Sequence, residues 1–147
     1  MADQQNYSNH RRWYPLFHFV LVPLLVLNLL DHVVRIFTSV GTERWEQAFW
    51  AVFSVVLILL ALAARLMSIT VQDRVIRLEE RLRYREVLSQ ELAAKASALS
   101  IGQIVALRFA SDEELPGLVE RTLNGEFAKP KEIKLAVKNW RADYLRV

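Results

Sequence analysis

Residues 45–67, WEQAFWAVFSVVLILLALAARLM, form a long apolar segment with charged side chains only near its two ends. At about 1.5 Å per residue, a helix of this length crosses a hydrocarbon layer of roughly 30 Å. Residues 14–37, YPLFHFVLVPLLVLNLLDHVVRIF, have a similar length and an equally apolar character. We therefore expect two transmembrane helices.

The seven residues between these segments, TSVGTER, are too few to do more than turn the chain back, which predicts an antiparallel hairpin. Trp13 and Tyr14 at one end, and Trp45 and Trp50 at the other, are placed where aromatic rings favour the headgroup zone. Arginines precede the first segment and follow the second, whereas the loop has only Arg44. The positive-inside bias therefore predicts both termini in the cytoplasm. The flanking arginines are Arg11, Arg12, Arg65, Arg74, Arg77, Arg81, Arg83 and Arg85.

Composition supports a membrane chain and argues against an enzyme. With 53% hydrophobic residues among 147, there are too few polar side chains to cover a soluble globule. Cysteine is absent, so thiol chemistry is excluded, and no common phosphate-loop, zinc-protease, nucleophile-elbow or calcium-loop motif is found. We predict no catalytic residues, no metal ligands and no resident cofactor. The first apolar segment is too long and too interrupted for a cleavable leader, which favours an anchor.

The helix is expected to continue past the second span as an arm over residues 68–88. Its apolar side chains recur at spacings of four and three, which is typical of a heptad seam that docks on a neighbouring helix. Glu79 and Arg83 lie one turn apart and are expected to pair on a solvated face. The seam residues are Val71, Val75, Leu78 and Leu82.

Residues 89–147 are predicted to form a small helical domain, and residues 1–13 a cytoplasmic N-terminal segment. Helix starts are indicated by two capping-box pairs, Ser100 with Gln103 and Ser111 with Glu114, and by Pro130. Gly125 suits a helix end, and Pro116 predicts a break or kink after Ser111. Such a domain has a marginal core, so we expect it to need the arm or a partner for stability.

Asp31, His32 and Arg35 bring polar groups into the last turns of the first span. Asp31 and Arg35 share a helix face, which predicts an interfacial salt bridge; a contact with a partner is the alternative. His18 and His32 are fourteen residues apart, so a regular helix would place both rings on nearly one face. Haem or tetrapyrrole binding in an oligomer is a minor alternative role for these two histidines.

The end of the chain is expected to be a helix with a basic stripe that could bind anionic lipid, nucleic acid or an acidic partner. Residues 100–147 contain eight basic and seven acidic side chains, which does not favour nucleic acid. The stripe comprises Lys131, Lys134, Lys138 and Arg141.

Three segments of the tail, VQDRVIRLEERLR, ALRFASDEELPGLVERTL and PKEIKLAVKNWRADYLRV, resemble signature segments of a bacterial family of small two-span membrane proteins, classed as a domain of unknown function. The resemblance extends over nearly the whole chain and implies a bacterial inner-membrane protein. It implies no activity and no site residues.

The sequence thus predicts an all-α protein: a transmembrane hairpin over residues 14–67, a cytoplasmic arm and a small C-terminal helical domain. The leading functional hypothesis is a non-enzymatic accessory or scaffold subunit of a membrane complex, with the bilayer and other subunits or further copies as partners. A regulatory protein whose basic final helix binds anionic lipid or nucleic acid is the alternative.

Overall fold

A computed structural model describes residues 5–10 and 13–144 of the chain, and it confirms the prediction of an all-α protein. Within these residues no strand is formed, and the sole bridge of extended chain joins Ala110 to Trp140. In chain order the elements are the π-helix η1 (Leu16–Leu21) and the α-helices α1 (Val22–Thr38), α2 (Thr42–Val87), α3 (Gln90–Ala96), α4 (Ile101–Leu107), α5 (Leu115–Leu123) and α6 (Pro130–Ala136).

The chain divides into two compact units, each of which includes part of α2. One unit is Trp13–Ile69, and the other combines Met1–Arg12 with Thr70–Arg146. The arm predicted from the heptad pattern therefore belongs to the same unit as the small helical domain.

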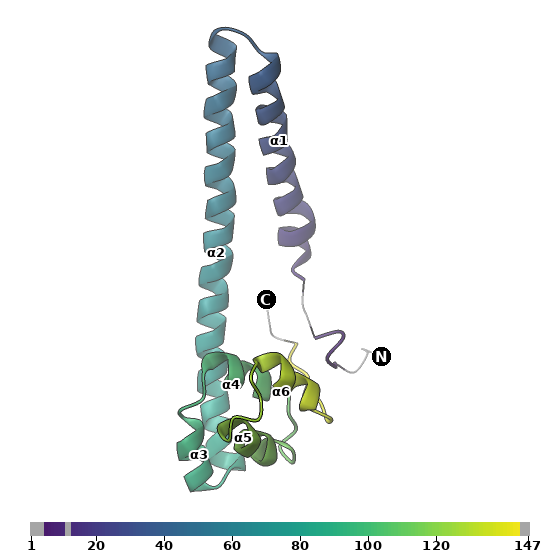
Figure 1. Cartoon of the computed structure of the whole chain (residues 1–147), viewed down its shortest axis with the longest axis vertical. Coiled ribbons are helices and arrows are strands. Elements are labelled where there is room, and N and C mark those ends of the chain that lie inside the picture. The colour runs from purple at the N-terminus through teal and green to yellow at the C-terminus, as the bar shows by residue number, and fades with distance from the viewer. Residues whose placement is uncertain (1–4, 11–12, 145–147) are drawn as a thin grey trace. The chain divides into compact units, whose positions relative to one another are not determined.

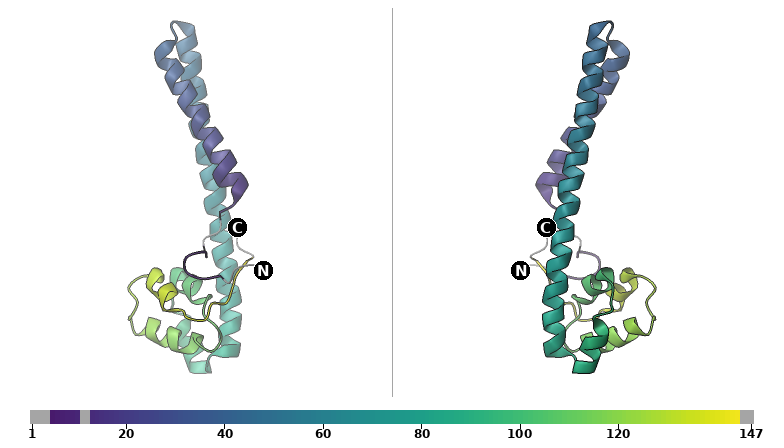
Figure 2. Two further views of the ribbon diagram at one scale, coloured as in Figure 1. Left: turned by 90° about the vertical axis from the view of Figure 1, so that its right-hand side faces the viewer. Right: turned by 90° about the vertical axis from the view of Figure 1, so that its left-hand side faces the viewer.

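The first unit is a helical hairpin in which α1 and the first part of α2 run antiparallel (Figures 1 and 2). Gly41 makes the reversal possible, because its φ of +62° lies in the left-handed region that favours glycine. The buried side chains on α2 in this unit are small, Ala51 and Ser54, which lets two helix backbones approach closely.

The remaining surface of the hairpin is apolar and exposed. In the apolar windows of Leu16–Thr38 and of α2, 0% and 6% of the residues are buried, whereas the core helix of a soluble protein is mostly buried. Both helices are long and apolar enough to cross a membrane. Large exposed side chains on this surface include Leu24, Leu27, Leu30, Val52, Val56, Leu59 and Leu60.

The first turns of the hairpin are a π-helix instead of the regular α-helix that the sequence predicted. Pro23 lies in the first turn of α1, directly after this segment. Proline has no N–H to donate and its ring crowds the carbonyl four residues earlier, so the preceding turns widen. In a π-helix each residue turns about the helix axis by a smaller angle than in an α-helix. His18, which lies in η1, therefore occupies a different face from the one that a regular α-helix would give it.

The second unit packs α3 to α6 against the end of α2 (Figure 1). Tyr84 and Leu88 of α2 belong to its hydrophobic core, so the arm completes a core that the small domain lacks by itself. The other buried apolar residues of this core are Ala96, Leu99, Ile104, Ala106, Leu107, Ala110, Leu115, Leu118, Val119, Ile133 and Val137.

Most predicted helix boundaries of this unit are confirmed. Ser100 and Gln103 form a reciprocal capping box, Gly125 has a φ of +77° just after α5, and Pro130 begins α6. The start of α5 differs: the Ser111 hydroxyl accepts from the Glu114 N–H, but the helix begins only at Leu115. Pro116 then lies in the first turn, where its missing N–H costs nothing.

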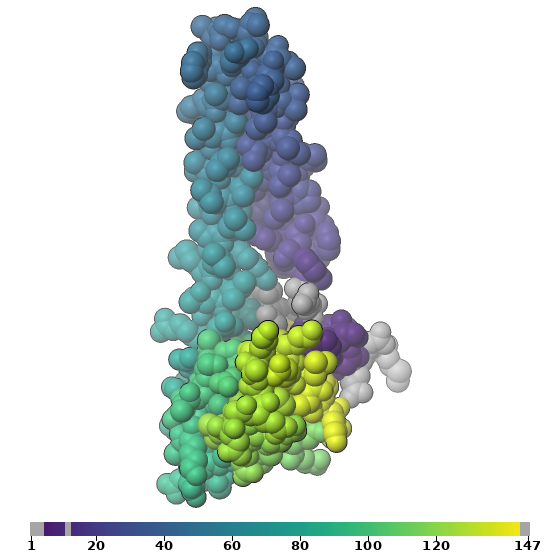
Figure 3. Space-filling view, in the orientation of Figure 1, coloured from purple at the N-terminus to yellow at the C-terminus, as the bar shows by residue number. Residues whose placement is uncertain are grey.

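The N-terminal segment packs on the chain's last described residues, as Figure 3 shows. Gln5 exchanges two hydrogen bonds with the Asp143 backbone, and its side-chain oxygen accepts from the Asp143 N–H at 2.8 Å. The His10 ring lies 5.8 Å from both the Phe109 and Trp140 rings. These contacts hold both ends of the described chain on one domain.

Two helical glycines test how closely the helices of this domain pack. A Cβ at Gly117 of α5 meets nothing within 4 Å, so Gly117→Ala should stabilise the domain by about 0.5–1 kcal/mol through lower unfolded-state entropy. A Cβ at Gly102 of α4 lies 3.0 Å from the Pro130 ring, so Gly102→Ala should lose that gain. Thermal unfolding of the full chain in detergent measures both, and equal gains would contradict the close α4–α6 packing.

Candidate functional site

The apolar seam on the arm part of α2 is exposed along its whole length. Val71, Val75, Leu78 and Leu82 are 60, 49, 63 and 53% exposed, although they alternate at the spacing of a packed helix face. The residues that α2 buries in the domain, among them Ile76 and Tyr84, lie on the opposite face of the helix. The small domain therefore leaves the predicted seam uncovered.

Arg83 anchors α2 to the loop that follows α4, and it is only 8% exposed. Its guanidinium donates to one Asp112 carboxylate oxygen at 2.7 and 2.6 Å and to the Ala110 carbonyl at 2.7 Å. A further bond of 3.2 Å reaches Glu80. The predicted pair of Arg83 with Glu79 on a solvated face is wrong, because the domain folds over this side of α2 and supplies better acceptors.

Glu80 is the buried acid of this network, with 4% of its surface exposed. It accepts from Arg83 and, at 3.4 Å, from Arg141 of the C-terminal segment. Burial raises the pKa of Glu80 above its ordinary value, and the nearby arginines oppose that rise. Two basic residues from different segments thus compensate one desolvated carboxylate.

A second buried arginine holds the C-terminal segment. Arg108, at the end of α4, donates to the Asp143 carboxylate at 2.9 Å and lies over the Phe109 ring at 4.2 Å. Backbone bonds between Arg141 and Phe109 and between Ser111 and Asn139 align this segment with the loop after α4. The burial of Arg83 and Arg108 was not predicted from the sequence, because buried and exposed arginines on a helix occur at the same spacings.

The basic stripe expected on a final helix is not formed as one face. The predicted helix ends at Ala136, and Val137 is extended, so Lys138 and Arg141 follow α6 in irregular chain. Lys138 and Asn139 instead donate their backbone N–H groups to the Glu114 carboxylate, which fixes the chain direction there. Lys134 lies over the Phe109 ring, and Arg141 pairs with Glu80. Lipid binding by Lys131, Lys134, Lys138 and Arg141 stays a prediction, but the single helix face from which it was inferred is not formed.

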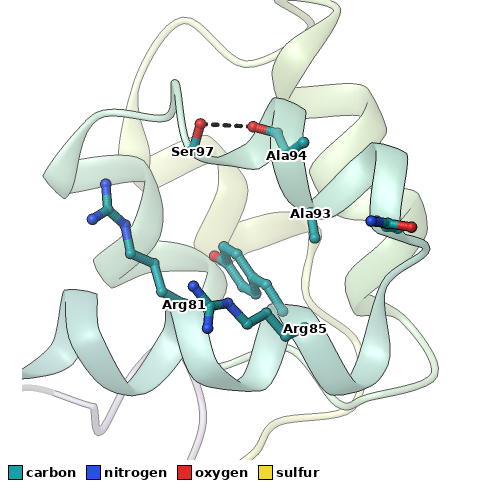
Figure 4. Close-up of a pocket in the computed structure, with 7 residues that line it drawn as sticks. Arg81, Arg85, Ala93, Ala94 and Ser97 are labelled. Carbon is teal, nitrogen blue, oxygen red and sulfur yellow. Dashed lines mark hydrogen bonds between the residues drawn. The ribbon is translucent and has the colours of Figure 1, made fainter.

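A cavity of about 560 Å³ opens between the end of α2 and α3. Figure 4 shows Arg81 and Arg85 on one side of it and Ala93, Ala94 and Ser97 on the other. Tyr84 and Gln90 complete the lining. The site has positive charge and hydrogen-bond donors, but its lining has no carboxylate or imidazole to act as a general base.

Tyr84 is the buried polar side chain of this cavity. It is 3% exposed, and its hydroxyl finds no hydrogen-bond partner among the described residues. Burial, followed by the Glu80 charge, raises the pKa of Tyr84 above its ordinary value. The hydroxyl therefore stays protonated and has no activated nucleophile or base beside it.

The polar residues of the hairpin divide into an outer pair and two ties between helices. The predicted Asp31–Arg35 pair is confirmed at 2.7 Å, with both side chains more than half exposed. Asn28 donates to the Ser54 hydroxyl at 2.7 Å, and His32 contacts the Gln47 amide oxygen at 2.8 Å. These two hydrogen bonds were not predicted from the sequence, because they join residues on different helices.

The two histidines proposed for haem binding lie in different surroundings. The His32 ring contacts the Gln47 side chain of α2 and is stacked with the Trp50 ring at a centroid distance of 6.3 Å. The His18 ring instead contacts the Tyr14 carbonyl at 3.0 Å. His18 also lies within η1, so the regular helix assumed for their alignment is absent. No group of three or more metal-ligating side chains occurs among residues 5–10 and 13–144. A tetrapyrrole role for these histidines stays a prediction.

The outer pair of the hairpin can be tested by single and double substitution. Arg35→Leu should destabilise the protein, because Asp31 then keeps an unpaired charge on a helix surface that is otherwise apolar. Adding Asp31→Asn should recover much of the loss. Thermal stability in detergent measures both effects, and an equally unstable double variant would contradict a pair that only compensates its own charges.

The buried carboxylate of the domain predicts a pH dependence of stability. Since the folded pKa of Glu80 is raised above the ordinary 4.5, Glu80's own contribution is fully present below pH 4.5 and is lost as pH rises through the folded value. The stability of wild type relative to Glu80→Gln should therefore fall across this range. Chemical unfolding of both proteins from pH 4 to pH 7 measures the difference. A difference that grows with pH would show that the arginine partners outweigh desolvation.

Comparison with known proteins gives a family for the whole chain. A family model described as "Family of unknown function (DUF6526)" matches residues 1–147. No curated protein and no solved structure matches the chain. The match extends over the hairpin, the arm with its exposed seam, and the domain that buries Arg83 and Arg108. The chain belongs to this family of unknown function.

Proposed function

We propose that the protein is a non-enzymatic scaffold subunit of a bacterial inner-membrane complex, anchored by its hairpin and docking through the arm of α2. Both termini lie in the cytoplasm in this proposal. The observation that supports it is the exposed apolar seam Val71, Val75, Leu78 and Leu82, on the part of α2 that follows the apolar residues 45–67.

Membrane anchoring is supported by the surface of the hairpin. Its outward side chains are leucine, valine and phenylalanine over most of both helices. A soluble monomer rarely exposes a contiguous apolar patch of more than a few hundred Å². Lipid chains cover such a surface without cost, and the helix backbones satisfy their own hydrogen bonds. The arginine bias at the helix ends supports the cytoplasmic orientation.

Docking through the arm is supported by the distance of the seam from the span. Leu82 follows Met67 by fifteen residues, about 22 Å along a helix, which is beyond the reach of the hydrocarbon layer. Lipid chains therefore cannot cover the end of the seam. Around it the helix surface is charged, so the four apolar side chains form a stripe of the width that a partner helix covers.

The alternative is a regulatory protein with a basic final helix. It was based on a basic stripe along one helix, and α6 does not form that stripe. The final helix is seven residues long, and two of the four basic residues contact groups of their own domain. A scaffold binds its partners through its surface and needs no catalytic groups. The basic cavity between α2 and α3, whose lining has no general base, is consistent with such a role.

Replacing the centre of the seam tests the docking role. Val75→Ser combined with Leu78→Ser should leave folding and insertion intact, because both side chains are exposed, but should release the protein from its native assembly. Leu135→Ser is the matched control, since Leu135 on α6 is 56% exposed and lies outside the seam. Native mass in mild detergent measures the assembly. An unchanged mass of the seam variant would overturn the proposal.

A further inference from the structure

We propose that the partner on the seam is a second copy of this chain, packed parallel and in register as a two-stranded coiled coil. This inference rests on the proposed function in one respect: membrane anchoring orients all copies alike. The choice of a second copy rests on a separate observation, the charges that flank the seam.

The flanking charges are opposite on the two sides of the seam. With Val71 and Leu78 at d positions and Val75 and Leu82 at a positions, the g positions are Arg74 and Arg81, and the e positions include Glu79 and Glu86. All four charged side chains are exposed. None of them forms an ion pair with a described residue of its own chain. The seam thus has a basic edge and an acidic edge, both available to a partner.

In a parallel coiled coil, each g residue meets the e residue five positions later on the partner helix. Arg74 then faces Glu79 of the second copy, and Arg81 faces its Glu86. The two-fold symmetry repeats both pairs in the other direction, so every flanking charge is matched. An antiparallel pair would place arginine against arginine and glutamate against glutamate. The pattern therefore selects the parallel arrangement, which is also the one that a shared membrane imposes.

The basic edge also repels itself within one chain. Arg81 of this edge has Arg77 four residues before it and Arg85 four residues after it, and like charges at this spacing on a helix are unfavourable. An acidic edge from a second copy would offset part of this repulsion. Val75 at a and Leu78 at d have the residue types that favour two strands, whereas Val71 at d and Leu82 at a have the reverse, so the choice of two strands rests on the flanking charges.

The seam is short, and the membrane compensates for its length. Two heptads are too few for a stable coiled coil between free peptides. Chains held in one bilayer meet at a high effective concentration and in one orientation, so a small interface suffices. Arg85 occupies the next d position, where it would end the apolar seam.

Cysteine cross-linking tests the arrangement directly, because the natural chain has no cysteine. In membranes that contain the full chain, Val71→Cys and Leu82→Cys should each oxidise to a disulfide with the same residue of the second copy. Asp73→Cys, at the f position on the far side of α2, is the matched control and should not cross-link. Cross-linking of Val71→Cys only with Leu82→Cys in a mixture would show antiparallel pairing and overturn the proposal.

Charge reversal tests the specificity, with Leu82→Cys as the reporter in every chain. The pair Arg74→Glu and Arg81→Glu should reduce cross-linking about tenfold, and so should the pair Glu79→Arg and Glu86→Arg. Co-expression of the two double variants should restore cross-linking, because their edges then match. Loss without restoration would overturn the proposed edge pairing, since general damage to the arm would then explain it.

The results separate this inference from the proposed function. If the seam cysteines do not cross-link but the serine variant of Val75 and Leu78 leaves its native assembly, a different subunit covers the seam and only the second copy is wrong. If neither effect is seen, the seam has no docking role and both proposals fail. Cross-linking with a monomeric native mass would point to transient collision and would also overturn a stable dimer.

Discussion

The continuous helix α2 (Thr42–Val87) fixes the direction of its side chains, and each compact unit contains part of it. Its sequence from Thr42 to Val87 has neither glycine nor proline, so a single register places every side chain on a definite face. In the arm, that register directs Ile76, Glu80 and Arg83 into the domain and leaves the apolar seam outward. Core formation and the proposed docking therefore use opposite faces of the same helix.

The domain that folds on this helix is held by charge as well as by apolar packing. Buried arginines add little net stability compared with well-packed apolar residues, but removing one partner is costly because a desolvated charge remains. Arg83 and Arg108 bond to the loop after α4 and to the C-terminal segment, which have no helical hydrogen bonds of their own. The arginines thus connect irregular chain to the helices, in a small domain whose apolar core is marginal.

The helical class, the position of the hairpin and most helix ends of the domain were predictable from the sequence alone. These features depend on local chemistry: apolar length for the hairpin, side-chain caps such as Ser100, and the backbone freedom of Gly125. The Asp31–Arg35 pair was predictable for the same reason, since both residues lie on one helix one turn apart. The apolar seam was also predictable, because heptad spacing depends only on residues along a single helix.

Long-range packing sets which charges are buried, where the last helix ends and which polar groups join α1 to α2, and the sequence alone predicted none of these. Arg83 and Arg81 look alike in sequence, but only Arg83 lies on the face that the domain covers. The last helix stops at Ala136 because the following chain bonds to Glu114 and to the loop after α4. Asn28 meets Ser54, and His32 meets Gln47, through the packing of two separate helices. Each of these contacts joins residues distant in the chain, and their free energy depends on burial that no local pattern encodes.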